Sequence, residues 1–289
     1  MSTLRALLTD VEQRLSSSHR LDAESRADAR REARWLAAGV LDCAPVEVAS
    51  RLDAPIPVAT ADLIRAAAER RAAGEPMAYA VGSAPFRHLV LAVDARVLIP
   101  RPETEVVVEE ALRAVAQRPG GTAVDIGTGS GAIALSLATE GRFDRVVATD
   151  LSADALDVAR ANAARLAPLV PVEFRQGADC APLDGQARVI VSNPPYIAYE
   201  EAVALPASVR DWEPATALFA PDHGMARYQA LLSEAGPYLE PEGVLVLEVD
   251  SQRAGETAAL AAQLGWRHVR LVRDLTGRDR VLVAHRPAS

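Results

Sequence analysis

The tetrapeptide Asn193-Pro194-Pro195-Tyr196 has the most specific chemistry in the chain. Its two prolines fix the backbone φ and remove two N–H donors, so the segment is stiff and presents carbonyl acceptors. The side-chain oxygen of Asn193 and the carbonyl of Pro194 can hold the two hydrogens of an NH2 group. Tyr196 offers a flat face to a planar amide or base. The segment indicates a site for a planar NH2 group, although taken alone it also fits a rigid turn after a strand.

A second candidate site is the sequence AVDIGTGSG over residues 123–131, a hydrophobic run that ends in a glycine turn. Glycines tolerate positive φ and let a ligand approach the backbone closely. The spacing G-x-G-x-G fits a dinucleotide pyrophosphate less well than G-x-G-x-x-G does. Asp150 ends the next expected strand, where a carboxylate can accept hydrogen bonds from both hydroxyls of a ribose. We therefore predict an adenosine-type cofactor held by Asp125, Gly127, Thr128, Gly129, Ser130, Gly131 and Asp150.

The order of these segments narrows the chemistry. The glycine turn also fits a strand-turn-helix packed through its glycines, with Asp150 capping the next helix. Asp179, past the third expected strand, is a candidate for the adenine amino group, though an ordinary loop aspartate fits nearly as well. Because Asn193 to Tyr196 follow the next strand, the cofactor is expected to be S-adenosylmethionine, with Asn193 close to both cofactor and acceptor.

We expect catalysis of methyl transfer to rest on placement of the acceptor. The lone pair of an amide nitrogen is shared with its carbonyl, and no strong base stands near Asn193 in the sequence. Pinning both N–H groups would direct the lone pair at the methyl group from roughly 3–3.5 Å, where orientation contributes most to the rate. The expected catalytic residues are Asn193, Pro194, Pro195 and Tyr196.

Elements that position these residues are visible in the hydrophobic pattern from residue 104 onward, where expected strands alternate with expected helices. This order is typical of an α/β fold, a doubly wound, largely parallel sheet that binds ligands at the carboxyl ends of its strands. Expected strands are Thr122–Ile126, Arg145–Thr149, Val172–Arg175, Arg188–Ser192, Val244–Val249, His268–Val272 and Arg280–Ala284, and expected helices include Ile133–Thr139 and Ala153–Leu166.

The chain before this region has a different pattern. Residues 1–80 show helical spacing of apolar residues, as in Leu4, Leu7 and Val11, and indicate a small helical domain. Residues 81–103 contain short β-rich runs that predict a hairpin linker, which leaves 104–289 as the cofactor-binding domain.

Composition limits the function classes. The chain has 289 residues, 49% of them hydrophobic, and a formal net charge of −8. Residues 1–85 carry 11 arginines against 12 acidic residues, and the remainder carries 20 against 27, so neither part has the basic excess typical of nucleic-acid binding. Two distant cysteines indicate neither a disulfide framework nor a metal site. We expect no metal and, without a signal peptide or a long apolar run, a cytoplasmic protein that binds no membrane.

Several motifs resemble those of the peptide chain release factor glutamine methyltransferases. The resemblance spans roughly residues 75–285, through EPMAYAVG (75–82), VLIPRPETE (97–105), DIGTGSG (125–131), ATDLS (148–152), SNPPYI (192–197), EPATALF (213–219) and DLTGRDRV (274–281). Enzymes that act on a ribosomal protein's glutamine share NPPY but lack the PRPETE form of residues 100–105. In the region of Cys180 family members often carry an aromatic residue, and Asp250 stands where a glycine is common after Glu248.

This resemblance implies a class I S-adenosylmethionine-dependent methyltransferase fold with an N-terminal helical domain that docks the substrate. It implies methylation of the glutamine side-chain amide in the Gly-Gly-Gln loop of bacterial release factors, with Asn193–Tyr196 binding that glutamine. Gly127–Gly131, Asp150, Asp179 and Cys180 would hold the cofactor. The main alternative is a nucleic-acid amino methyltransferase acting on N6 of adenine or N2 of guanine, which needs base flipping and usually a basic flank. A non-enzymatic adenosine-binding module would have no use for the stiff acceptor segment.

Overall fold

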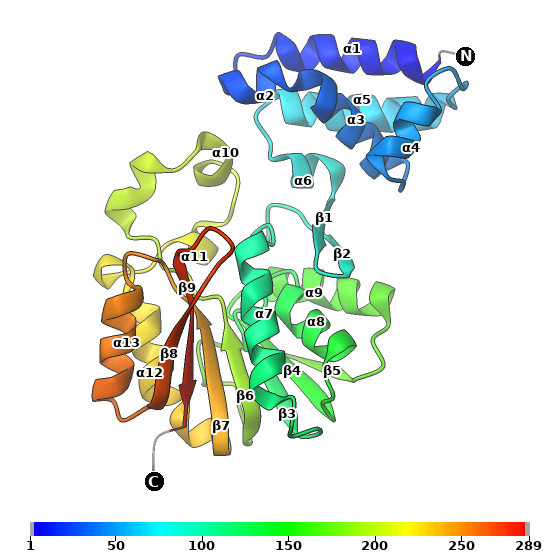
Figure 1. Cartoon of the computed structure of the whole chain (residues 1–289). Helices are drawn as coiled ribbons and strands as arrows, with labels where there is room; N and C mark the ends of the chain where they lie inside the picture. Colours follow the sequence, from blue (N-terminus) through cyan, green and yellow to red (C-terminus); the bar gives the residue numbers. More distant parts are fainter. Residues whose placement is uncertain (1–2, 287–289) are drawn as a thin grey trace. The chain divides into compact units, whose positions relative to one another are not determined.

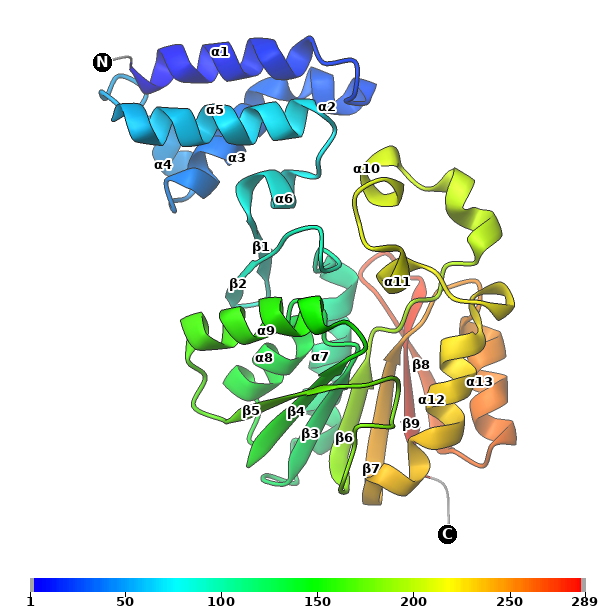
Figure 2. The ribbon, with the colours of Figure 1, turned by 180° about the vertical axis from the view of Figure 1, so that it is seen from behind.

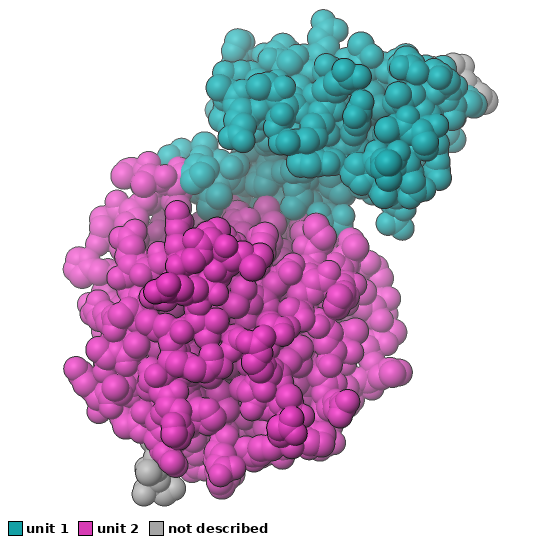
Figure 3. Space-filling view, in the orientation of Figure 1, with its two compact units in different colours: residues 1–83, 206–212 teal, residues 84–205, 213–289 magenta. Residues whose placement is uncertain are grey.

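The computed structural model describes residues 3–286 and divides them into two compact units. The first unit comprises the chain up to Ser83 together with Pro206–Trp212, and the second comprises Ala84–Leu205 and the chain from Glu213 onward (Figure 3). Nothing in the sequence marks Pro206–Trp212 as part of the helical unit. No helix among residues 3–286 has the length and apolar character needed to cross a membrane.

The first unit is a bundle of helices with its own apolar core. Helix α1 buries Leu4, Leu7 and Val11 along one face, as its spacing predicts. A buried ion pair between Arg71 and Glu32 crosses the bundle through hydrogen bonds of 2.9 and 2.7 Å. The helices are α1 (Leu4–Ser16), α2 (Ala23–Ala27), α3 (Ala29–Val40), α4 (Pro45–Ser50), α5 (Val58–Ala72), α6 (Met77–Val81) and, from the returning segment, α10 (Ala207–Arg210) (Figure 1).

A seven-stranded sheet in the order β5-β4-β3-β6-β7-β9-β8 organises the second unit. Its first five strands are parallel, and β9 runs antiparallel to both β7 and β8. This arrangement confirms the predicted doubly wound, largely parallel sheet. The strands are β3 (Thr122–Ile126), β4 (Arg145–Asp150), β5 (Val172–Gln176), β6 (Ala187–Ser192), β7 (Leu239–Glu248), β8 (Arg267–Arg273) and β9 (Asp279–His285), so only β7 begins well before its predicted start, at Leu239 instead of Val244.

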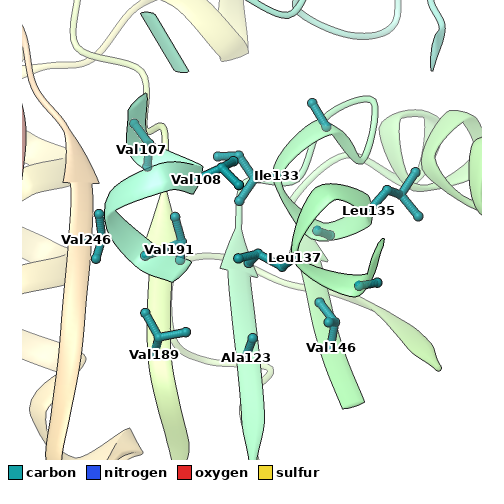
Figure 4. Packing of buried hydrophobic residues seen from close by; sticks show 14 of the residues in the cluster. Val107, Val108, Ala123, Ile133, Leu135, Leu137, Val146, Val189, Val191 and Val246 are labelled. Carbon is teal, nitrogen blue, oxygen red and sulfur yellow. The ribbon is translucent and has the colours of Figure 1, made fainter. Parts of the chain in front are cut away.

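Helices cover both faces of the sheet (Figures 1 and 2). On one face α7 (Pro102–Val115), α8 (Ala132–Glu140) and α9 (Ala153–Leu166) pack against the strands, and Figure 4 shows side chains of α7 and α8 meeting those of β3, β4, β6 and β7. On the other face α12 (Ala226–Glu234) and α13 (Ala254–Gln263) form a second core cluster. Successive residues of β3 face opposite clusters, Ala123 toward the first and Val124 toward the second, as the two-residue period of a strand requires.

Shorter elements complete the second unit. A hairpin of β1 (Ser83–Phe86) and β2 (Leu89–Ala92) lies within the segment expected to contain one. The segment between β6 and β7 contains the 3-10 turns η1 (Tyr199–Ala204) and η2 (Asp222–Gly224) and the short helix α11 (Ala215–Leu218), while η3 (Gly236–Tyr238) directly precedes β7.

Strand register brings the candidate site together. Ile126 at the end of β3 pairs with Thr149 of β4 on one side and with Ser192 of β6 on the other. Ser192 in turn pairs with Leu247 of β7. Asp150 at the end of β4 and Asn193 directly after β6 therefore lie at the same edge of the sheet.

Candidate active site

A cavity of about 330 Å³ opens at this edge of the sheet. Its walls come from the glycine turn after β3, the end of β4, the loop after β5 and the segment after β6, and further residues come from Arg96–Thr104 and from Pro214 to Ala217. Nine of the residues predicted for the site line it, namely Gly127, Thr128, Gly129, Ser130, Asp150, Asp179, Asn193, Pro194 and Pro195. The described lining residues do not include Asp125, Gly131, Cys180 or Tyr196.

The glycine turn is shaped for close approach of a ligand. The backbone N–H groups of Gly127 and Thr128 both donate to the carbonyl of Thr149, at 2.9 and 2.8 Å. Gly127 and Gly129 have φ values of +75° and +53°, which side chains rarely adopt. A Cβ atom at either position would meet no atom within 4 Å, so a side chain there would extend into open space beside the turn.

Asp150 is fixed in place by the backbone around it. Its Oδ2 accepts from the N–H of Gly129 at 2.9 Å, and its Oδ1 accepts from the N–H of Ser152, also at 2.9 Å. A carboxylate oxygen has a second lone pair, so both oxygens keep acceptor capacity toward the cavity. The acid and the glycine turn thus form one rigid unit that presents acceptors for a pair of hydroxyl groups.

Asp125 lies behind the turn. It is fully buried, and its Oδ2 accepts from the Thr128 hydroxyl at 2.7 Å and from the N–H of Ala134 at 3.0 Å. Burial raises the pKa of this carboxyl to about 7, because the charged form is deprived of water. Its other oxygen has no hydrogen-bond partner among the described residues. The placement of Asp125 gives it a part in holding the turn to α8.

The loop after β5 separates its two candidate residues. Asp179 has a φ of +46°, and its carboxylate accepts from Arg227 of α12 at 2.8 Å, both residues lining the cavity. Cys180 lies instead in the core cluster with α12, and burial raises its pKa to about 12. Leu151, which the sequence did not suggest, lines the cavity and is 56% exposed.

Asn193 is tethered through its amide nitrogen. Nδ2 donates to the hydroxyl of Thr104 at 3.1 Å, which leaves the amide oxygen as the acceptor that Asn193 can offer a ligand. Pro194 and Pro195 continue the cavity wall. Tyr196 does not line the cavity. Its hydroxyl donates to Glu248 at 3.3 Å, and burial raises the pKa of that hydroxyl.

Two carboxylates that sequence reasoning did not place at the site prove to be buried beside it. Glu248, at the end of β7, accepts from Thr104 at 2.6 Å, and burial raises the pKa of Glu248 to about 7. Glu213 pairs with Arg101 and accepts from the N–H of Ile99 at 3.2 Å. The only sequence signal for these residues was their place within or beside motifs of the family resemblance.

Two family models match separate stretches of the chain. The model described as PrmC N-terminal domain matches residues 9–82, and that described as Methyltransferase small domain matches residues 106–207. A release factor glutamine methyltransferase of Cereibacter sphaeroides is 38% identical over 270 residues, which is 93% of this chain and 96% of that protein. Its counterpart in Nitratidesulfovibrio vulgaris is 35% identical over 99% of this chain and 96% of its own length.

The chain belongs to the release factor glutamine methyltransferase family. A further relative under that name, from Moorella thermoacetica, is 42% identical over 82% of this chain and 84% of its own length. Among solved structures, a methyltransferase from Pyrococcus furiosus superposes with a TM-score of 0.53 over 68% of this chain and 89% of its own, at 20% identity. That likeness concerns the fold, and with the Methyltransferase small domain match it confirms the class I methyltransferase fold implied by the resemblance.

Membership in the glutamine methyltransferase family bears on the two candidate acceptors. The relatives described above are all named release factor glutamine methyltransferase, and that name does not refer to a nucleic acid. The nucleic-acid alternative is therefore not favoured. In residues 3–286 no cluster of three His, Cys, Asp or Glu side chains is arranged to hold a metal ion.

Proposed function

We propose that this chain transfers the methyl group of S-adenosylmethionine to the side-chain amide nitrogen of the glutamine in the Gly-Gly-Gln loop of bacterial peptide chain release factors. The observation that carries the proposal is a single cavity that joins two groups of residues. One group is the glycine turn with Asp150, and the other is Asn193-Pro194-Pro195. Family membership supports the choice of a protein glutamine as the acceptor.

The residues present fit S-adenosylmethionine. The open space over Gly127 and Gly129 is a cradle that Cβ atoms would narrow, as expected for a turn against which a bulky group lies. Asp150 offers two oriented acceptor oxygens for the ribose hydroxyls. Asp179 offers an acceptor for the adenine amino group, and Leu151 offers an apolar surface, both in the same cavity wall.

On this proposal the residues after β6 bind and orient the acceptor amide. The Asn193 oxygen and the Pro194 carbonyl accept its two N–H hydrogens, which directs the nitrogen lone pair along one line. S-adenosylmethionine, when bound, would supply the electrophilic methyl group and a neutral sulfide as leaving group, and the acceptor nitrogen releases one of its two protons to solvent as its bond to the methyl carbon forms. On this proposal the chain contributes alignment of the acceptor nitrogen with the methyl group, and such orientation of bound reactants lowers the barrier to reaction.

We further propose that the helical unit docks the release factor. A glutamine side chain offers few atoms for recognition, so binding energy must come from a surface remote from the amide. Residues 9–82 match a family model of their own, which supports a separate task for this unit. A short peptide containing Gly-Gly-Gln should then have a far lower kcat/KM than intact release factor with the full-length chain, and comparable values would contradict docking.

One labelling experiment tests the function. The purified chain and methyl-labelled S-adenosylmethionine are incubated in three separate reactions, one with release factor, one with total RNA and one with DNA. We expect label on the release factor, at the glutamine, and at most a small residual rate of labelling by the Asn193→Ala variant, which should still bind the cofactor. Label on nucleic acid instead would overturn the proposal, and substantial turnover by Asn193→Ala would remove Asn193 from the acceptor site.

A further inference from the structure

We propose that Thr104 and Glu248 are positioning residues that fix the orientation of the Asn193 amide, so that its oxygen and not its NH2 group faces the acceptor. This inference rests on the proposed function, because it explains how the site selects a group that donates hydrogen bonds. Neither residue lies in the segment after β6. Thr104 comes from the first turn of α7 and Glu248 from the end of β7.

The need for such a device follows from the chemistry of asparagine. Its amide has an acceptor oxygen and a donor nitrogen of nearly equal size, and a rotation by half a turn exchanges them. An acceptor NH2 group requires the oxygen. With the amide reversed, Asn193 would present two hydrogens to two hydrogens, and the acceptor would lose a hydrogen bond and meet a repulsive contact.

The hydroxyl of Thr104 decides between these orientations. It has one proton, and the proton is directed to Glu248, at an oxygen-to-oxygen distance of 2.6 Å. The oxygen of the same hydroxyl can then only accept, and the group within reach is Nδ2 of Asn193 at 3.1 Å. A hydroxyl that is already donating selects the NH2 end of the amide, which turns Oδ1 toward the other side.

Glu248 sets the direction of this chain of hydrogen bonds. Its side chain is buried, with 1% of the residue exposed, so water does not compete for its oxygens. A carboxylate without a proton only accepts, and Glu248 accepts from Thr104 through Oε2 and from the Tyr196 hydroxyl through Oε1. Tyr196 thus contacts the same carboxylate from the acceptor segment itself, which ties that segment to β7.

The DLTGRDRV motif supports the buried charge. Arg280, near the start of β9, lies close enough to Glu248 to lower the pKa of its carboxyl, against the larger effect of burial. Arg280 is itself held by Asp274, whose Oδ2 accepts from its Nε at 3.3 Å. Arg280 and the two hydroxyl donors oppose the effect of burial, and Glu248 is in its ionised, accepting form above its pKa of about 7.

The test compares two variants of Thr104 with a control variant of Thr257 in the full-length chain. Thr104→Val removes the hydroxyl with little change of volume, and Thr104→Ser keeps it. Thr257→Val is the matched control, since Thr257 is buried like Thr104 but its hydroxyl donates to the backbone carbonyl of Arg253, just before α13. For each variant the kcat and KM are measured with intact release factor, and the dissociation constant of S-adenosylmethionine is measured by calorimetry.

We expect Thr104→Val to lower kcat at least about tenfold while the cofactor dissociation constant stays within about twofold, as for a contact realised in the transition state. Thr104→Ser should keep kcat within about threefold of the parent chain, and Thr257→Val should be unchanged. In an Asn193→Ala background, Thr104→Val should lower the residual rate no further, because residues that act through one another are not additive.

Three results would overturn the inference while leaving the proposed function intact. These are normal kcat in Thr104→Val, an equal loss in Thr104→Ser, or losses from Thr104→Val and Asn193→Ala that multiply. The proposed function fails in a different way, since the parent chain would then place no label on release factor at all. A fold defect in Thr104→Val would appear as lost cofactor binding, and Thr104→Ser then decides the question alone.

Discussion

Removing either partner of the Arg101–Glu213 pair should have unequal effects, because the two side chains differ in exposure. The Glu213 side chain is 1% exposed and that of Arg101 is 33% exposed. Arg101→Met leaves a carboxylate buried with one remaining donor, the N–H of Ile99. Glu213→Gln keeps an acceptor for that N–H and leaves a guanidinium that water can reach. The arginine substitution should therefore be the more destabilising one.

The same contacts give the size of the expected loss of unfolding free energy in each variant. Breaking a buried pair by removing one partner typically costs about 3–5 kcal/mol, and the exposure of Arg101 reduces this to about 2–3 kcal/mol. Exchanging a charged for a neutral acceptor in Glu213→Gln should cost only about 1 kcal/mol. The free energy of unfolding of the second unit should thus be about 1–2 kcal/mol lower in Arg101→Met than in Glu213→Gln.

Tryptophan fluorescence during urea unfolding measures this difference in the second unit alone. Of the three tryptophans, Trp35 and Trp212 belong to the helical unit and Trp266 to the second unit. Trp266 is 4% exposed and its ring N–H donates to the carbonyl of Leu232, so its emission should change on unfolding. In a background with Trp35 and Trp212 replaced by phenylalanine, an equal or greater loss in Glu213→Gln would refute the reasoning.

Two further predictions concern carboxylates of the site. Asp150→Ala should weaken S-adenosylmethionine binding by about 1–3 kcal/mol in calorimetry, while Asp157→Ala on the exposed face of α9 should not, and equal affinities would remove Asp150 from the site. Glu248 has a folded-state pKa of about 7, above its usual 4.5, so it makes the folded chain lose stability as pH rises between these values. The free energy of unfolding is measured between pH 4.5 and pH 7 for the parent chain and for Glu248→Gln. Over this range the parent chain should lose at most about 3 kcal/mol more than the variant. The same pH dependence in both proteins would show that burial does not penalise the charge of Glu248.

Local patterns in the sequence were sufficient to predict the main strands and helices of the second unit. Buried strands such as β3 are short apolar runs bounded by turn residues, and α9 matches its predicted bounds of Ala153–Leu166. The glycine turn and Asp150 could be predicted because both lie at strand ends, which a parallel sheet brings to one edge. These features depend on residues close together in the chain.

The sequence did not indicate the direction of individual side chains. Tyr196 was expected to offer its ring face to the acceptor, and its hydroxyl has a partner, Glu248, that the sequence did not indicate. Asp179 and Cys180 were expected to lie in the region that holds the cofactor, and of the two only Asp179 lines the cavity. Asp179 adopts a φ of +46°, a conformation that its residue type allows but does not require, so the directions of these two side chains could not be predicted from the sequence.

The orientation of the Asn193 amide shows why side-chain directions could not be predicted from the sequence. The residue type and its place after β6 identify the group that does the chemistry, and both can be read from the sequence. Which end of the amide faces the acceptor depends on Thr104, which is 89 residues from Asn193 in the chain. The direction of the Thr104 proton depends in turn on Glu248, which is 144 residues from Thr104. Neither contact leaves a local pattern, because each joins strand and helix ends that meet only when the sheet is complete. On this proposal, specificity for an NH2 group belongs to the assembled sheet edge and not to the segment after β6 alone.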